Sequence, residues 1–423
     1  MAEITEILTD DEVLEIISVC KDVPETSNVT VLEWGTSTLS EEVTGFLGEH
    51  LKLTIKAKID NDQIVNESFF IKTLPFRAKD RRFVEEIGVL RKEVHLYVNV
   101  LNEMPKYDEK SHWSPECYYA RDDLLVLEDL SVKDFHLLPP EIEFTDDHMK
   151  VALKSLAMMH ASSINFEKNV VKKPLNDIYD GMLYEVTVAR RNNWFRTGLK
   201  AIEQVALQRT RYKYMAETIK KKFYDAMNVV FDMVDNELIP PDFLCVISHR
   251  DLWRNNLMYK FARSEDDEET LNYNAPLEAV LIDFQIARYL PPAVDILMLL
   301  YLLQRNNDRK SRYDAHISHY YECMKDALAH FGLDIESIFP FEELWRTCEH
   351  FQLLGAVLKG VFLPMTHLPK GVIDDIHKNA DAYRKFIAVD RTETILHYID
   401  TDEYFRNWMI EAVEELIEIT LIH

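Results

Sequence analysis

Cysteine is scarce in this 423-residue chain, and its five cysteines lie far apart with no Cys-x-x-Cys pair. This odd number and wide spacing argue against a disulfide framework and against a structural zinc site. Long apolar runs are also missing, since no window approaches the roughly 18 uncharged apolar residues of a membrane-spanning helix. The acidic start, MAEITEILTDDEVLEII, lacks the regions of a signal or transit peptide. We therefore expect a cytoplasmic protein in the reducing cytosol.

Positive charge is in the minority, with 48 Lys and Arg against 73 Asp and Glu and a net charge of −25. Such a chain should repel nucleic acid and anionic membrane surfaces, so we expect neither as a partner. No obligate protein partner is evident. An acidic surface could favour a cationic substrate, although solubility is the simpler explanation. The length favours two or three domains or one bilobal unit.

The first part of the chain is predicted to be rich in strands. Alternating, β-branched patterns indicate strands, and apolar residues at helical spacing indicate helices. The expected order is a helix at 5–22, strands at 28–37, 50–59 and 67–75, a long helix from about Asp80 to Asn102, and strands at 117–121 and 123–130. This is the element order of a kinase-type small lobe.

After Asp134 most windows show helical periodicity. The exceptions are short strands around VISHRDL, NLMYK and EAVLIDF. We therefore predict an α+β, bilobal, protein-kinase-like fold. Its expected parts are a β-rich N-lobe at 1–126, a hinge at 127–131 and a mostly helical C-lobe at 132–423.

The stretch VISHRDLWRNNLMYK, residues 246–260, resembles a kinase catalytic loop, with His249-Arg250-Asp251 followed five residues later by Asn256. Phosphoryl transfer needs a carboxylate beside the attacking hydroxyl and oxygen ligands for Mg²⁺. Asp251 is the candidate catalytic base, and Asn256 would offer an amide oxygen to the metal. His249 would position Asp251 by bonding to backbone, and a histidine in this place is more often a scaffold group than an acid or base.

A second metal ligand is predicted at Asp283, which ends the strand EAVLIDF and lies 27 residues after Asn256. That separation suits a hairpin that returns the chain to the same site. Its acidic tip, residues 262–276, is interpreted as a solvated turn.

Lys72 is the candidate cation for the phosphates, because a lone lysine inside the apolar strand FFIKTLP is costly unless it is paired or functional. A partner carboxylate should come from the following helix. Two registers compete, Glu85-Glu86 and Glu93, and the apolar neighbours of Glu93 favour it.

Nucleotide contacts from the backbone are harder to recognise. The stretch VLEDLS would link the lobes and hold adenine through main-chain groups of Glu128 and Leu130, or be an ordinary strand end. Gly45 and Gly48 could form the turn over the phosphates. They do not match Gly-x-Gly-x-x-Gly, and such a pair is more often a tight hairpin.

A peptide platform is not expected, because Asp283-Phe284-Gln285 lacks glycine. Asp295 follows only 12 residues after Asp283, with no Ala-Pro-Glu motif. This favours a small hydroxylated acceptor. Asp295 would tie down the catalytic loop, or be a simple first-turn acid of the next helix. The segment 351–369 could line an apolar acceptor pocket, although core packing is the more common explanation.

Together FFIKTLP, LVLEDL, SHRDLWRNN and LIDFQIARYLPPAVDILMLLY resemble the ecdysteroid kinase-like family, also called CHK kinase-like. This family belongs with the aminoglycoside and choline phosphotransferases in the protein-kinase-like fold. The resemblance, from about residue 30 to 330, implies ATP and Mg²⁺, with an ecdysteroid-like steroid or a xenobiotic or plant metabolite as acceptor. It implies the roles already given for Lys72, Glu93, Asp251, Asn256 and Asp283.

One position departs from the family. Arg250 stands where the family usually has glycine. This departure keeps open the alternative of a catalytically weak kinase-like protein that binds a small ligand. A true protein kinase is a third possibility.

Overall fold

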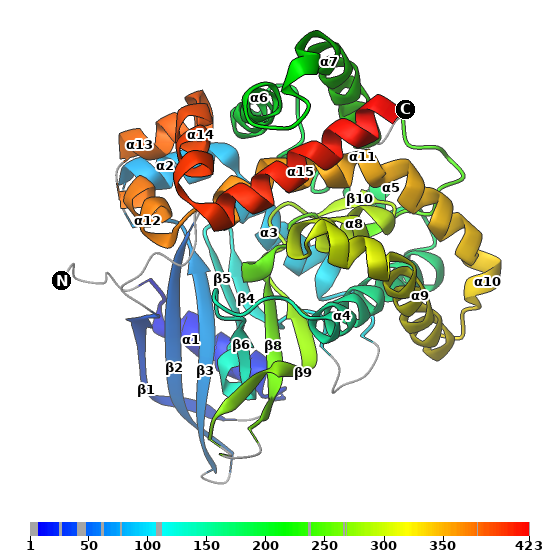
Figure 1. The fold of residues 1–423 in the computed structure, drawn as a ribbon. Helices are drawn as coiled ribbons and strands as arrows, with labels where there is room; N and C mark the ends of the chain where they lie inside the picture. The colour runs from blue at the N-terminus through cyan, green and yellow to red at the C-terminus, as the bar shows by residue number, and fades with distance from the viewer. Residues whose placement is uncertain are drawn as a thin grey trace. The chain divides into compact units, whose positions relative to one another are not determined.

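The computed structural model describes residues 7–24, 28–39, 48–60, 63–76, 78–106, 112–235, 238–264, 267, 269–378 and 380–422. The chain divides into two compact units (Figure 1). The small unit comprises Met1–Pro105 and Ser114–His136, and the large unit comprises Lys106–Trp113 and Leu137–His423. Residues 127–131 fall inside the small unit, and their role as a hinge stays a prediction.

The small unit is built on a five-stranded antiparallel sheet with the order β1-β2-β3-β5-β4. The strands are β1 (Val29–Thr38), β2 (Glu49–Ile59), β3 (Gln63–Thr73), β4 (Cys117–Arg121) and β5 (Leu124–Glu128). All five occur where the sequence pattern predicts strands. The remaining elements are α1 (Asp10–Cys20), α2 (Ala78–Ile87), α3 (Val89–Leu96), a π-helical turn (Tyr97–Leu101) and a 3-10 turn (Leu130–Lys133).

The core of the small unit lies between α1 and one face of the sheet. Alternate residues of β2, namely Leu51, Leu53, Ile55 and Ala57, are buried, because successive side chains of a strand point to opposite faces. Val13, Ile16 and Ile17 of α1 pack against this face, and Leu8 joins them. In Figure 1, α1 and the first three strands are drawn in blue.

The predicted long helix at 80–102 is interrupted. It divides into α2 and α3 at Gly88, whose φ of 72° is a left-handed conformation that glycine adopts without steric cost. The prediction of one continuous helix is therefore wrong at this residue. Gly88 is the N-cap of α3, the helix that contains Glu93.

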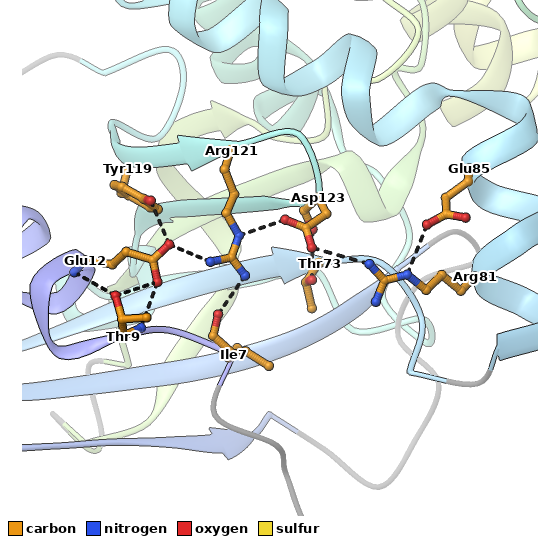
Figure 2. Close-up of polar contacts among 9 residues, drawn as sticks. All are labelled: Ile7, Thr9, Glu12, Thr73, Arg81, Glu85, Tyr119, Arg121 and Asp123. Atoms are coloured by element: carbon orange, nitrogen blue, oxygen red, sulfur yellow. Dashed lines mark hydrogen bonds and ion pairs between the residues drawn. The ribbon is translucent and has the colours of Figure 1, made fainter.

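A chain of ion pairs ties α1 to the sheet (Figure 2). The Arg121 guanidinium donates to Glu12 Oε1 at 2.5 Å and to Asp123 Oδ1 at 2.7 Å, and the Tyr119 hydroxyl donates to Glu12 at 2.8 Å. Arg81 of α2 donates to the other oxygen of Asp123 at 3.4 Å. Burial raises the pKa of Glu12, but its hydrogen bonds and Arg121 outweigh this effect, and the pKa falls from 4.5 to about 2.

Glu12→Gln should lower the free energy of unfolding by about 1–2 kcal/mol at pH 7, because the charge-assisted bonds to Arg121 are lost. The folded-state pKa is depressed, so this stabilisation exists above pH 4.5 and disappears as pH falls towards about 2. Urea unfolding at pH 7 and at lower pH measures the difference. Glu15→Gln on the exposed face of α1 is the control, and equal effects of the two substitutions would contradict the prediction.

The large unit is mainly helical, as predicted. Its helices are α4 (Asp146–Asn165), α5 (Leu175–Tyr179), α6 (Asn193–Gln208), α7 (Ala216–Met233), α8 (Ala293–Leu303), α9 (Asn306–His330), α10 (Ile335–Ile338), α11 (Phe341–Thr366), α12 (Lys370–Lys378), α13 (Ala380–Arg384), α14 (Thr392–Thr401) and α15 (Glu403–Ile422). Every residue of α8 is buried, and α4, α9 and α11 pack against it. No helix in the described part of the chain is long and apolar enough to cross a membrane.

Strands also occur after Asp134, and all but the first of them lie wholly within the large unit. The described strands are β6 (Phe135–Leu137), β7 (Val246–Ser248), β8 (Leu257–Arg263), β9 (Leu271–Leu281) and β10 (Arg288–Leu290). β6 and β10, of three residues each, were not predicted. The predicted tip at 262–276 is also too long, because both flanking strands extend into it and residues 271–276 belong to β9.

Candidate functional site

The β8–β9 hairpin places Asn256 beside the end of β9. Leu257 pairs with Leu281 in an antiparallel register, and the Ile282 N–H donates to the Asn256 carbonyl at 3.1 Å. Asp283 follows directly. The expected return of the chain over 27 residues therefore occurs, and it sets the two predicted metal ligands at neighbouring ends of two paired strands.

Asn256 is oriented by its own loop. Its side-chain Nδ2 donates to the Asp251 carbonyl at 2.8 Å, and its side chain is almost fully buried. Among the described residues no hydrogen bond reaches its Oδ1. The amide therefore presents an oxygen, the atom a hard cation prefers.

His249 contacts backbone on both sides of its ring. Nε2 lies 2.9 Å from the Ile282 carbonyl, and Nδ1 accepts the Asp251 N–H at 3.2 Å. These contacts fix a neutral ring whose Nε2 carries the proton. Burial lowers the pKa of His249, which agrees with a neutral ring. Phe284 packs on the imidazole, with ring centroids 4.5 Å apart. These contacts show the positioning arrangement expected for this histidine.

Asp295 holds the catalytic loop through its backbone. Its two carboxylate oxygens accept the backbone N–H groups of His249 at 2.6 Å and Arg250 at 2.9 Å. It also lies in the first turn of α8, so both interpretations of this acid are correct. Burial raises its pKa, but His160 and the N–H donors outweigh burial, and the net shift is downward.

Two further residues around Asp295, His160 and Tyr320, could not be recognised as site residues from the sequence. His160 of α4 lies 3.2 Å from Asp295 through Nε2 and 2.7 Å from the Tyr320 hydroxyl through Nδ1. All three side chains are fully buried or nearly so. They come from α4, α8 and α9, and no local spacing links them.

Lys72 and Glu93 pair within the small unit. Nζ of Lys72 lies 2.6 Å from Oε2 of Glu93, and the two side chains are 7% and 1% exposed. Of the two candidate partners of Lys72, the structure therefore selects Glu93. Glu85 on α2 instead accepts a hydrogen bond from Arg81. The contact of this pair with phosphates stays a prediction.

The four residues predicted to contact the nucleotide are Gly45, Gly48, Glu128 and Leu130. Gly45 lies outside the described residues. A Cβ on Gly48 would be 2.9 Å from the Thr73 carbonyl, so close packing on β3 already requires glycine there. The Glu128 N–H donates to the Glu116 carbonyl at 2.8 Å and is therefore not free for adenine. Leu130 begins the 3-10 turn, and its adenine contact stays a prediction.

The chain matches a known protein family. The ecdysteroid kinase-like family model matches residues 43–333, more than two thirds of the chain. No curated protein sequence matches. Among solved structures, a Plasmodium vivax ethanolamine kinase is 12% identical with a TM-score of 0.36, and the match covers 87% of this chain and 86% of that one.

A gentamicin complex of APH(2″)-IIa is also 12% identical, with a TM-score of 0.34 and 97% of both chains covered. Aminoglycoside phosphotransferase APH(2″)-Ib with ADP bound is 12% identical, with a TM-score of 0.32, covering 88% of this chain and 96% of that one. Likeness at this level carries no information on the acceptor.

The chain belongs to the ecdysteroid kinase-like family. This membership places it among small-molecule kinases, which are phosphotransferases. The predicted fold class is confirmed as α+β of the protein-kinase-like type, with a small sheet-based unit and a large helical unit.

Asp295→Asn should destabilise the large unit by about 3 kcal/mol, because an NH₂ group would replace one acceptor of a buried N–H. The amides of residues 249–251 should also exchange faster with solvent. Thermal unfolding and hydrogen exchange measure the two effects. Asp314→Asn on the exposed surface of α9 is the control. Unchanged exchange at 249–251 would contradict the anchoring role.

Proposed function

We propose that the chain is an ATP- and Mg²⁺-dependent kinase that transfers the γ-phosphoryl group to a hydroxyl of an ecdysteroid-like steroid or of a xenobiotic or plant metabolite. The observation that carries the proposal is the loop 249–256 held beside Asp283 by the β8–β9 hairpin and by Asp295. The family supports the same reaction class. A cytoplasmic location, with no nucleic acid, membrane or obligate protein partner, remains part of this proposal.

Asp251 is proposed as the catalytic base. Its side chain is 8% exposed, and its backbone is fixed through its N–H to His249 and its carbonyl to Asn256. With its backbone fixed in this way, Asp251 would need less ordering before its carboxylate accepts the proton of the attacking hydroxyl.

Asn256 and Asp283 are proposed to hold Mg²⁺. The fit rests on the donor set, an amide oxygen and a carboxylate, which suits a hard cation that also takes phosphate oxygens as ligands. Asp283 adopts a left-handed φ of 68°, which is uncommon for a residue with a side chain and agrees with a functional position. When bound, the ion would neutralise charge developing on the phosphates.

Lys72 is proposed to contact the phosphates, with Glu93 fixing its ammonium group. A buried pair of this kind costs desolvation free energy and is weak evidence for a purely stabilising role. Gly45, Gly48, Glu128 and Leu130 remain proposed nucleotide contacts.

The acceptor is proposed to be small. After Asp283 the chain forms only a turn and the three-residue β10 before α8 begins at Ala293, which leaves no long segment to bind a peptide. The proposed pocket-lining segment 351–369 is buried throughout 354–364, where core packing explains it. Its partly exposed residues, at 352–353, 365–367 and 369, are the ones that could meet a ligand.

Asp251→Asn should lower the rate of phosphoryl transfer by about 100- to 10 000-fold, because the proton acceptor is lost while the shape is kept. Nucleotide affinity, measured by calorimetry with Mg-ATP, should stay within about twofold. Asp326→Asn on the exposed surface of α9 is the matched control and should leave both quantities unchanged.

The acceptor is sought by incubating the protein with labelled ATP and panels of hydroxylated steroids and glucosides. Transfer to proteins alone would instead support a protein kinase. Intact Mg-ATP binding without transfer to any compound would count against the enzyme and favour a small-ligand binding protein. Thermal stabilisation by a compound but not by Mg-ATP would support that alternative directly.

A further inference from the structure

Arg250 is the unusual residue of the catalytic loop. Its φ of 70° is left-handed, a conformation that is unfavourable for a residue with a Cβ. Its long cationic side chain is only 1% exposed. Neither property favours stability, and both occur immediately before Asp251. A cost retained at this position calls for a functional explanation.

The charge that faces Arg250 comes from Glu185, in the segment between α5 and α6. Oε2 of Glu185 lies 3.5 Å from Nη2 of Arg250 and 2.5 Å from Nη1 of Arg288, the first residue of β10. Oε1 accepts the N–H groups of Thr187 and Val188, both at 2.8 Å. Glu185 is thus held by its own segment and joins two cations.

Glu185, Arg250 and Arg288 form a charged cluster. Within it, the contact between Arg250 and Glu185 is an ion pair without a hydrogen bond. Among the described residues none accepts a hydrogen bond from Nε, Nη1 or Nη2 of Arg250, although Glu185 is within ion-pair distance. Arg288, by contrast, also donates to the Val234 carbonyl at 3.0 Å. Burial raises the pKa of Glu185, but the two arginines outweigh it, and the pKa falls to about 2.

Glu185 is the carboxylate shared by the two buried guanidinium groups, and Asp235 also acts electrostatically on Arg288. Desolvation offsets much of the attraction in a buried ion pair, so such a pair is weak evidence for a purely stabilising role. The geometry of the cluster offers another explanation. The Arg250 N–H is held by Asp295 of α8, and its side chain is held by Glu185. The residue is therefore anchored at both its backbone and its guanidinium end.

We propose that Arg250 is a positioning residue for phosphoryl transfer, and that its attraction to Glu185 holds the strained backbone from which the Asp251 carboxylate projects. This inference rests on the proposed function, because Asp251 is taken as the base. Displacement of a catalytic group by about 1 Å can cost about 100-fold in rate. Arg250 would act through the loop and not by touching the substrate.

The test is Arg250→Met, which keeps length and removes charge. We expect kcat to fall by about 10- to 100-fold, with the KM for ATP and the acid limb of the pH–rate profile unchanged. Glu185→Gln should lower kcat similarly, and the double variant should be no slower than the slower single variant. Arg250→Gly, which relieves the left-handed strain, should fold at least as well as Arg250→Met and still be slow.

Arg309→Met is the matched control, since Arg309 pairs with Glu415 at 2% and 5% exposure. It should lower thermal stability without lowering kcat. A fall in stability with unchanged kcat at Arg250 would overturn the proposal, as would a shifted acid limb, which would mean a direct electrostatic effect on the base.

A second readout does not depend on turnover. Arg250→Met should speed hydrogen exchange of the Asp251 amide, which donates to His249. If the wild-type protein transfers phosphate to no acceptor, the proposed function fails, while faster exchange would still support the positioning role. Unchanged exchange would refute the positioning role whatever the activity.

Discussion

The carboxylate of Asp295 is the contact on which the large unit's site depends. It is fully buried, begins the fully buried helix α8, and accepts the N–H groups of His249 and Arg250. A buried charge needs several donors to offset its desolvation, and two backbone amides and His160 provide them. The loop is thus fixed to a core helix at the residues just before Asp251.

The positions of Asn256 and Asp283 relative to this loop are determined by the pairing of β8 with β9. The β8–β9 hairpin begins directly after Asn256 and ends just before Asp283, so the register between strands determines how far apart the two oxygen ligands lie. His249 bridges the two ends by contacting the Ile282 carbonyl. Hydrogen bonds to backbone groups, from strand partners and from the side chains of Asp295, His249 and Asn256, therefore position the chemistry.

Much of this could be predicted from local sequence. Strands and hairpin were visible because their signals lie within a few neighbouring residues, and the pairing of Lys72 with Glu93 followed from apolar neighbours on the helix. Contacts between distant elements could not be predicted, since nothing near His160 or Glu185 indicates its partner. The break at Gly88 was also missed, because a lone glycine does not reveal its φ.

The most direct test of the account is a crystal structure with Mn²⁺ and a non-hydrolysable ATP analogue. Anomalous scattering from the metal should appear within about 2.2 Å of Asn256 Oδ1 and of an Asp283 carboxylate oxygen, with analogue phosphates completing the coordination. A bound analogue whose metal contacts neither residue would contradict the central claim that this loop and hairpin form a phosphoryl-transfer site.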